Sequence, residues 1–153
     1  MRQPPTNICP MFAIAGTSGP AECITDSCAW WDCAASECAI VSLAAELELS
    51  RILQGYGYPV EVGRAQSYGE VPDLSGLPGV HIECKRAETL RLSAWMQQAE
   101  RDAERFGDGA PAVFFRRSRS PWCVMMKLED WMAIYKNRHE LPDTAVKGGG
   151  DNA

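Results

Sequence analysis

One stretch of this sequence decides the fold: VPDLSGLPGVHIECKR, residues 71–86. Its second half, residues 79–86, alternates apolar and polar side chains, which predicts a β-strand. Because successive side chains of a strand point to opposite faces, Glu83 and Lys85 share one face and Cys84 is turned into the core. The stretch therefore places a carboxylate and an ammonium group side by side on a sheet.

The Pro72–Asp73 step supplies a second carboxylate ten residues before Glu83. If Asp73 ends the preceding strand of the same sheet, the two carboxylates converge beside Lys85. Two hard oxygen ligands and several waters are what Mg²⁺ accepts, and a metal held in this way polarises a phosphate and activates water. The lysine would orient the nucleophile or offset charge in the transition state. The alternative is a solvent-facing strand on which Glu83 and Lys85 form a surface ion pair.

The segments on either side of this stretch predict an α/β domain. Residues 39–54 hold strong helix formers without glycine or proline, and Gly55 is a suitable helix end. Residues 58–65 predict a strand, and apolar residues at helical spacing predict an amphipathic helix over 90–106. Two strands and a closing helix follow, over 110–117, 121–128 and 128–136. The order α-β-β-β-α-β-β-α, with no internal repeat, predicts a mixed sheet.

Length and composition predict one soluble domain. The chain has 153 residues and 46% hydrophobic content, which excludes wholesale disorder. No apolar run reaches the length of a membrane span, and the first residues do not have the layout of a signal peptide, so we expect a cytoplasmic protein without membrane contact. The cytoplasm would be that of the host if a phage encodes the chain.

The charge is unevenly distributed. The net charge is 15 − 20 = −5, which alone argues against nucleic-acid binding. Residues 1–50 have one arginine and six acids, a net of −5, whereas residues 51–139 have thirteen basic and eleven acidic residues, a net of +2. The middle of the chain is therefore its basic part.

Five of the seven cysteines fall within thirty residues: Cys9, Cys23, Cys28, Cys33 and Cys38. Clustered thiols in a reducing compartment favour a bound metal, and tetrahedral zinc needs four ligands. We expect Cys9, Cys23, Cys28 and Cys38 to bind zinc, with Cys33 as a substitute ligand and an Fe–S cluster as the alternative. Reduced structural thiols or disulfides remain the other interpretation.

These features predict three parts of the chain. Residues 1–38 are a small Cys-rich metal-binding loop module, residues 39–137 are the α/β domain, and residues 138–153 are a flexible tail.

Residues 39–136 resemble the PD-(D/E)XK nuclease superfamily, in particular small archaeal-type and phage-encoded Holliday junction resolvases. Asp73, Glu83 and Lys85 match the family motif, and ELELSRILQGYGYPVEVGRAQS is similar to its opening helix and strand. The resemblance implies a restriction-endonuclease-like α-β-β-β-α-β core and a Mg²⁺ or Mn²⁺ ion held by Asp73 and Glu83. It also places Glu46 on the metal-site glutamate, although Glu48 fits the same helical pattern.

The resemblance extends to DNA contacts. Arg64 and Ser67 fall near the positions by which such resolvases hold a phosphate, and Gln98 lies on a helix similar to the one that follows the family motif. Arg116 and Arg117 lie in a basic turn that is suited to backbone phosphates. The alternatives are a solvated helix face for Gln98 and an ordinary hairpin tip for the two arginines.

The implied activity is a Mg²⁺-dependent endodeoxyribonuclease that cleaves branched DNA, such as a four-way junction, as a homodimer. Trp122, Met125 and Trp131 are candidates for the dimer interface, with core packing as the alternative. A nuclease for flaps or other branched DNA would use the same catalytic residues. A non-catalytic protein that uses the fold as a DNA clamp is the third interpretation. The Cys-rich module departs from the small resolvases, which begin close to the first helix.

Overall fold

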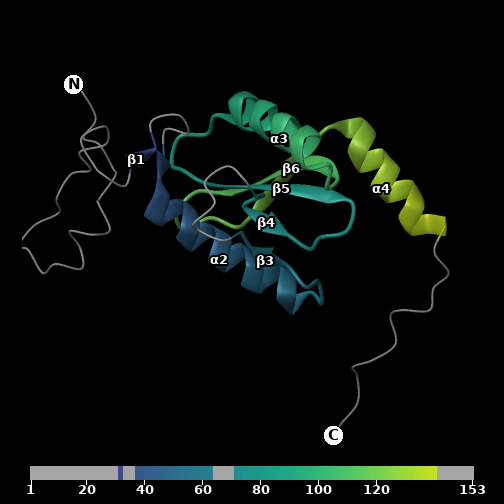
Figure 1. Cartoon of the computed structure of the whole chain (residues 1–153), viewed down its shortest axis with the longest axis horizontal. Coiled ribbons are helices and arrows are strands. Elements are labelled where there is room, and N and C mark those ends of the chain that lie inside the picture. The colour runs from purple at the N-terminus through teal and green to yellow at the C-terminus, as the bar shows by residue number, and fades with distance from the viewer. Residues whose placement is uncertain (1–30, 33–36, 64–70, 141–153) are drawn as a thin grey trace, which may run out of the picture.

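The computed structural model describes residues 31–32, 37–63 and 71–140, and their main feature is a five-stranded mixed sheet between helices (Figure 1). The sheet order is β3-β4-β5-β6-β7. Its strands are β3 (Glu61–Val62), β4 (Leu74–Ser75), β5 (Val80–Arg86), β6 (Ala110–Arg116) and β7 (Cys123–Met126). The helices are α2 (Ala39–Gly55), α3 (Leu92–Phe106) and α4 (Leu128–Glu140). A separate two-stranded sheet pairs β1 (Trp31–Asp32) with β2 (Glu37–Cys38).

The order of elements from α2 to α4 confirms the predicted α-β-β-β-α-β-β-α sequence. This part of the chain is α/β and compatible with a restriction-endonuclease-like core. The Cys-rich module is not visible as a unit, because residues 1–30 and 33–36 lie outside the described residues. Within the described part of the chain, none of the helices has the length and apolar character needed to cross a membrane.

The centre of the sheet is the parallel pair β5 and β6, which are joined by α3. Seven residue pairs are in register, from Val80 opposite Ala110 to Arg86 opposite Arg116. The pairing starts where the two backbones approach closely, because a Cβ on Gly109 would stand 2.3 Å from the carbonyl carbon of Gly79. All other pairings in this sheet are antiparallel.

The two faces of β5 pack against different helices. Ile82 and Cys84 belong to the core cluster that contains Ala45 and Leu49 of α2. On the other face, Val113 of β6 packs with Trp95 and Ala99 of α3, which recur at helical spacing. The side chains of Glu83 and Lys85 lie on this second face, because Glu83 is in register with Val113. Both faces of the central strand are therefore buried.

Three elements differ clearly in length from their predictions, and one of them, the strand expected over 121–128, is limited to Cys123–Met126. The strand expected over 58–65 is limited to Glu61–Val62 within the described residues, and the carbonyl of Val60 instead accepts hydrogen bonds from the side chains of Ser50 and Gln54, both at 2.7 Å. The closing helix continues to Glu140 rather than ending near 136, since the sequence has no glycine or proline before Pro142.

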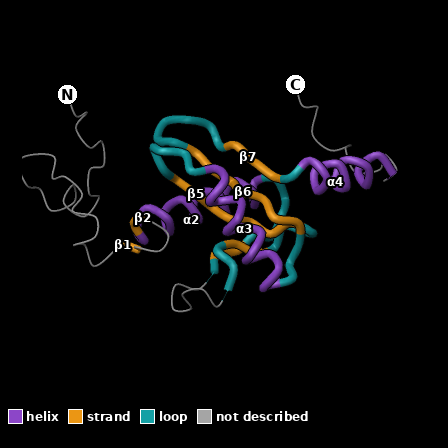
Figure 2. The backbone as a smooth tube through the Cα atoms, turned by 90° about the horizontal axis from the view of Figure 1, so that it is seen from above, coloured by secondary structure: helices purple, strands orange, loops and turns teal. Residues whose placement is uncertain are grey.

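Helix α4 projects away from the sheet (Figures 1 and 2). Lys127, just before the helix, forms a 2.8 Å ion pair with Glu100 of α3. Beyond that point α4 exposes large apolar side chains, and the rings of Trp131 and Tyr135 stack with centroids 5.0 Å apart. The helix therefore presents an apolar face that its own chain does not cover among the described residues.

Candidate active site

The candidate active site is centred on an ion pair within β5. Lys85 Nζ lies 2.8 Å from Glu83 Oε1, and each residue is only 2% exposed. The predicted alternation is correct, but the pair is not on a solvated surface, which removes the alternative of a surface ion pair. Removing two charges from water costs several kcal/mol per ion before their attraction is counted. A buried pair of this kind is a weak stabiliser, and a functional explanation is therefore needed.

Asp73 brings a second carboxylate to the same place. Leu74 of β4 is in register with Ile82 of β5 in an antiparallel pair, and Asp73 immediately precedes β4. Asp73 therefore lies near Glu83, and its charge contributes to the raised pKa of Glu83. Asp73 is half-buried, and its backbone carbonyl accepts a hydrogen bond from the amide of Gly63 at 2.8 Å.

The electrostatics of Glu83 reflect this crowding. Burial raises the pKa of Glu83 to about 8, and the charges of Asp73 and Asp102 add to the rise, whereas Lys85 opposes it. Burial and the neighbouring carboxylates therefore disfavour the charged form of Glu83, and a bound cation would favour it. Two carboxylates that repel one another are a donor set suited to a hard divalent cation. Within the described ranges no group of three or more His, Cys, Asp or Glu side chains is close enough to hold a metal, so protein ligands beyond two would require rearrangement.

Glu46 of α2 acts on the same region through Cys84. Burial raises the pKa of the Cys84 thiol, and the next largest contributions come from the negative charges of Glu46, Asp73 and Glu83. Lys85 lowers the same pKa. The charges of Glu46, Asp73, Glu83 and Lys85 therefore all act on the Cys84 thiol, although Cys84 itself faces α2 and Glu83 and Lys85 face α3.

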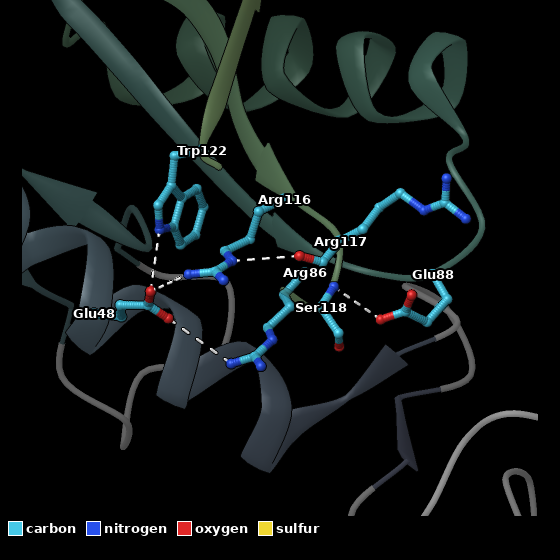
Figure 3. A network of polar contacts seen from close by, with 7 residues as sticks. All are labelled: Glu48, Arg86, Glu88, Arg116, Arg117, Ser118 and Trp122. Carbon is cyan, nitrogen blue, oxygen red and sulfur yellow. Dashed lines mark hydrogen bonds and ion pairs between the residues drawn. The ribbon is translucent and has the colours of Figure 1, made fainter. Parts of the chain in front are cut away.

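Glu48, the alternative to Glu46, takes part in a different set of contacts (Figure 3). Its carboxylate accepts a close hydrogen bond from Arg116 Nη1 and one of 3.3 Å from Trp122 Nε1. Arg86 Nη1 lies 3.8 Å from its other oxygen. Glu48 is therefore engaged with two arginines and Trp122 near the carboxyl ends of β5 and β6.

The predicted DNA-contacting residues that the structure describes lie on α3 and at the end of β6, and they differ in exposure. Arg116 is 18% exposed in its ion pair with Glu48, whereas Arg117 is exposed. Gln98 is half-buried on α3, one helical turn before Asp102, whose charge reaches Glu83. Arg64 and Ser67 lie outside the described residues.

Of the five cysteines predicted as metal ligands, Cys38 alone lies within the described residues. Cys38 is half-buried with a free thiol and immediately precedes the first residue of α2. Cys9, Cys23, Cys28 and Cys33 lie outside the described residues.

The partners of some residues near the site could not be predicted from sequence. His81 is buried with Nδ1 2.9 Å from Asp108, and its ring stacks on Phe106. No spacing rule links positions 81 and 108, so this pairing carried no signal. The helical spacing of Gln98 and Asp102 was visible and would have placed Asp102 beside the site once α3 was known to cover Glu83.

A carboxylate opposite a Glu-x-Lys strand, in a mixed sheet with this order of elements, defines a PD-(D/E)XK-type nuclease. The family model described as "Phage putative PDDEXK endonuclease" matches residues 63–149, more than half of the chain, and the chain belongs to this family. Asp73, Glu83 and Lys85 lie within the match, and Glu46 lies before it. Family membership makes the chain a nuclease-type enzyme with DNA as its substrate class. No curated protein and no solved structure matches the chain significantly.

Proposed function

We propose that this chain is a Mg²⁺-dependent endodeoxyribonuclease that hydrolyses DNA phosphodiester bonds, with Mn²⁺ as an alternative ion. The observation that carries the proposal is the buried Glu83–Lys85 ion pair beside Asp73. Burying these charges is costly, and the family provides a chemical reason to retain them.

Each of the four proposed catalytic side chains would have its own role. Asp73 and Glu83 would hold the ion, with Glu46 completing or assisting the site from α2. When bound, Mg²⁺ would polarise the phosphate and lower the pKa of a water molecule. Lys85 would orient that water and offset the charge that develops on the phosphate. The apolar side chains of Trp95, Ala99 and Val113 on the face of Glu83 would exclude bulk water and so strengthen these interactions.

The proposed substrate is branched DNA, with a four-way junction as the first choice, cut by a homodimer. The dimer proposal is supported by an apolar groove of about 430 Å³ at the base of α4. Its lining includes two of the predicted interface residues, Met125 and Trp131, and Trp131 is 47% exposed. The third, Trp122, contacts Arg116 and Glu48 instead. A second copy would cover the exposed face of α4.

The DNA contacts that we propose are Arg64, Ser67, Gln98, Arg116 and Arg117. Support is strongest for Arg117, which is exposed in a turn whose Ser118 amide is bound at 2.9 Å by Glu88. Gln98 gains support from its position one turn from Asp102.

For the rest of the chain we propose a metal-binding module over residues 1–38, the nuclease domain over 39–137 and a tail over 138–153. The module would hold zinc, or an Fe–S cluster, through Cys9, Cys23, Cys28 and Cys38, with Cys33 as a substitute. Cys38 connects the two parts, because α2 begins at the next residue.

Two rival functions use the same fold. A nuclease for flaps would keep the same catalytic residues and differ only in the DNA that it fits. A non-catalytic clamp would gain nothing from a buried ion pair opposite a carboxylate, and the burial of Glu83 and Lys85 speaks against it.

Cleavage of labelled DNA separates these functions. The purified full chain is incubated with a four-way junction, a flap and a linear duplex of the same sequence, with Mg²⁺ or with EDTA. We expect Mg²⁺-dependent cleavage with the junction cut fastest. Faster cleavage of the flap would reassign the substrate, and binding without cleavage of any DNA would favour the clamp.

A further inference from the structure

The carboxyl ends of β5 and β6 carry a basic cluster, which we define as Arg86, Arg116, Arg117 and Arg119. These are four of the fifteen basic residues in the chain, and among the described acidic residues Glu48 and Glu88 act on them. A chain with a net charge of −5 thus has a local excess of about two positive charges at one end of its central strands. Such a concentration marks a site for an anion.

Arg86 and Arg116 are held next to one another. They are in register across the parallel pair β5 and β6, so both side chains leave the same face of the sheet, on the α2 side. Two neighbouring guanidinium groups repel each other unless an anion lies between them. Glu48 of α2 fills that role, with one oxygen toward each arginine (Figure 3).

One carboxylate does not satisfy two guanidinium groups. Each guanidinium has five N–H donors. Within the described part of the chain, Arg86 makes its ion pair with Glu48 at 3.8 Å, which is too long for a hydrogen bond, and the group is one-third exposed. Arg116 donates to Glu48 and to the carbonyl of Arg117. Donors therefore remain available on the solvent side of both arginines.

Other contacts fix the geometry of the cluster before any ligand binds. The guanidinium of Arg116 lies 5.7 Å from the ring centroid of Trp122, in a cation–π contact. Glu88 binds the amide of Ser118 and so ties the start of the turn to the segment after β5. A preorganised pair of arginines loses less side-chain entropy on binding an anion than free surface arginines do.

We propose that Arg86 and Arg116, spaced by Glu48, bind a DNA backbone phosphate, and that Glu48 is the positioning residue of this subsite. The proposal rests on the proposed nuclease function. Lys85 and Arg86 are consecutive in β5, so their side chains leave opposite faces of the sheet. The subsite therefore lies at the carboxyl end of β5 on the α2 face, whereas the Glu83–Lys85 pair lies on the α3 face.

Equilibrium binding of the full chain to a labelled junction, with EDTA present to prevent cleavage, tests the subsite. We expect Arg86→Ala to weaken binding about ten-fold and to flatten the dependence of log K on log salt by about one. The matched control is Arg101→Ala, which removes an exposed arginine of α3. Equal effects of the two substitutions would overturn the proposal.

Glu48→Gln gives the sharper test, because the two accounts of Glu48 differ in sign. If Glu48 only repels DNA, removing its charge tightens binding. If it positions the arginines, binding weakens despite the lost negative charge, and the salt slope falls with it. Tighter binding would therefore overturn the positioning role. A melting temperature for each variant separates loss of fold from loss of binding.

The outcome is separable from that of the nuclease proposal. If the unmodified chain neither binds nor cuts DNA, the proposed function fails. If it binds and cuts, and Arg86→Ala behaves as Arg101→Ala does, only the subsite fails. Competition with inorganic phosphate distinguishes the two sources of the anion, since a subsite for a backbone phosphate should require millimolar or higher phosphate for release. Release by micromolar phosphate would overturn the assignment to DNA.

Discussion

Lys85 Nζ lies 2.8 Å from Glu83 Oε1, and the two side chains are almost fully buried between β5 and α3. Lysine and glutamate are rarely buried to this extent unless they are paired. Burying these two groups costs free energy of folding, so their burial points to a functional role for the pair. The first prediction concerns the ionisation of Glu83.

The free energy of unfolding should fall as pH rises from 4.5 to about 8, the ordinary and the folded-state pKa of Glu83. Its pKa is about 8 in the folded chain against an ordinary value of 4.5, so between these values the unfolded state releases a proton that the folded state keeps. The stabilisation is complete below pH 4.5 and is lost as pH approaches and passes 8, with a limiting slope of about 1.4 kcal/mol per pH unit.

Urea denaturation of the apo chain from pH 5 to pH 9, beside Glu83→Gln, measures this contribution. The substitution replaces the carboxyl group beside Lys85 with an amide, which gives an offset at every pH. The difference between the two proteins should nevertheless shift in favour of the variant as pH rises. A difference that is constant with pH would mean that Glu83 ionises normally.

The exposed face of α4 should mediate self-association. Trp131→Glu places a charge in the middle of the apolar groove and should convert a dimer to a monomer, measured by light scattering on a sizing column. Trp131 is 47% exposed, so the melting temperature of the monomer unit should change little. Asn137→Ala, an exposed polar position on the same helix, is the control. An unmodified chain that is already monomeric would refute the interface.

The cysteine module should contain about one zinc per chain, measured by elemental analysis of protein purified without added metal. Iron with sulfide would instead indicate a cluster, and no metal with free thiols would contradict the module.

Removal of that metal should also impair cleavage after Mg²⁺ is restored. Cys38 immediately precedes α2, and Glu46 follows eight residues later (46 − 38 = 8), so an unfolded module would fray the helix that carries Glu46. Full recovery of cleavage with Mg²⁺ alone would show that the module and the active site are independent.

The sequence predicted those elements whose bounds depend on residue spacing within the element itself. Strand β5 was predicted to within one residue, because its alternation is complete from Val80 to Arg86. Strand β3 begins at Glu61 rather than at residue 58, because the side chains of Ser50 and Gln54 on α2 donate hydrogen bonds to the carbonyl of Val60.

The site residues were likewise predictable within one stretch of sequence, whereas contacts between distant stretches were not. Asp73, Glu83 and Lys85 could be nominated from one short stretch, since strand register alone brings them together. The contacts of Glu48 with Arg86 and Arg116 join positions up to 68 residues apart, and no spacing rule connects them. The complete burial of Lys85 was also unforeseen, because it results from α3 covering a face that the alternation predicted to be polar.

Asp73→Asn is the variant that tests the account most directly. The substitution removes one carboxylate charge and keeps the size of a half-buried side chain. It should therefore disable the metal site while leaving the fold and most DNA binding intact. Glu61→Gln, which neutralises an exposed carboxylate on β3, is the matched control.

The decisive measurement is the rate at which Asp73→Asn cleaves a labelled four-way junction in Mg²⁺, compared with Glu61→Gln and the unmodified chain. Several kcal/mol of lost charge stabilisation corresponds to a rate loss of about a thousand-fold or more. We predict that loss for Asp73→Asn, with a normal melting temperature and normal cleavage by the control. Cleavage by Asp73→Asn at the unmodified rate would contradict the assignment of this site as the nuclease centre.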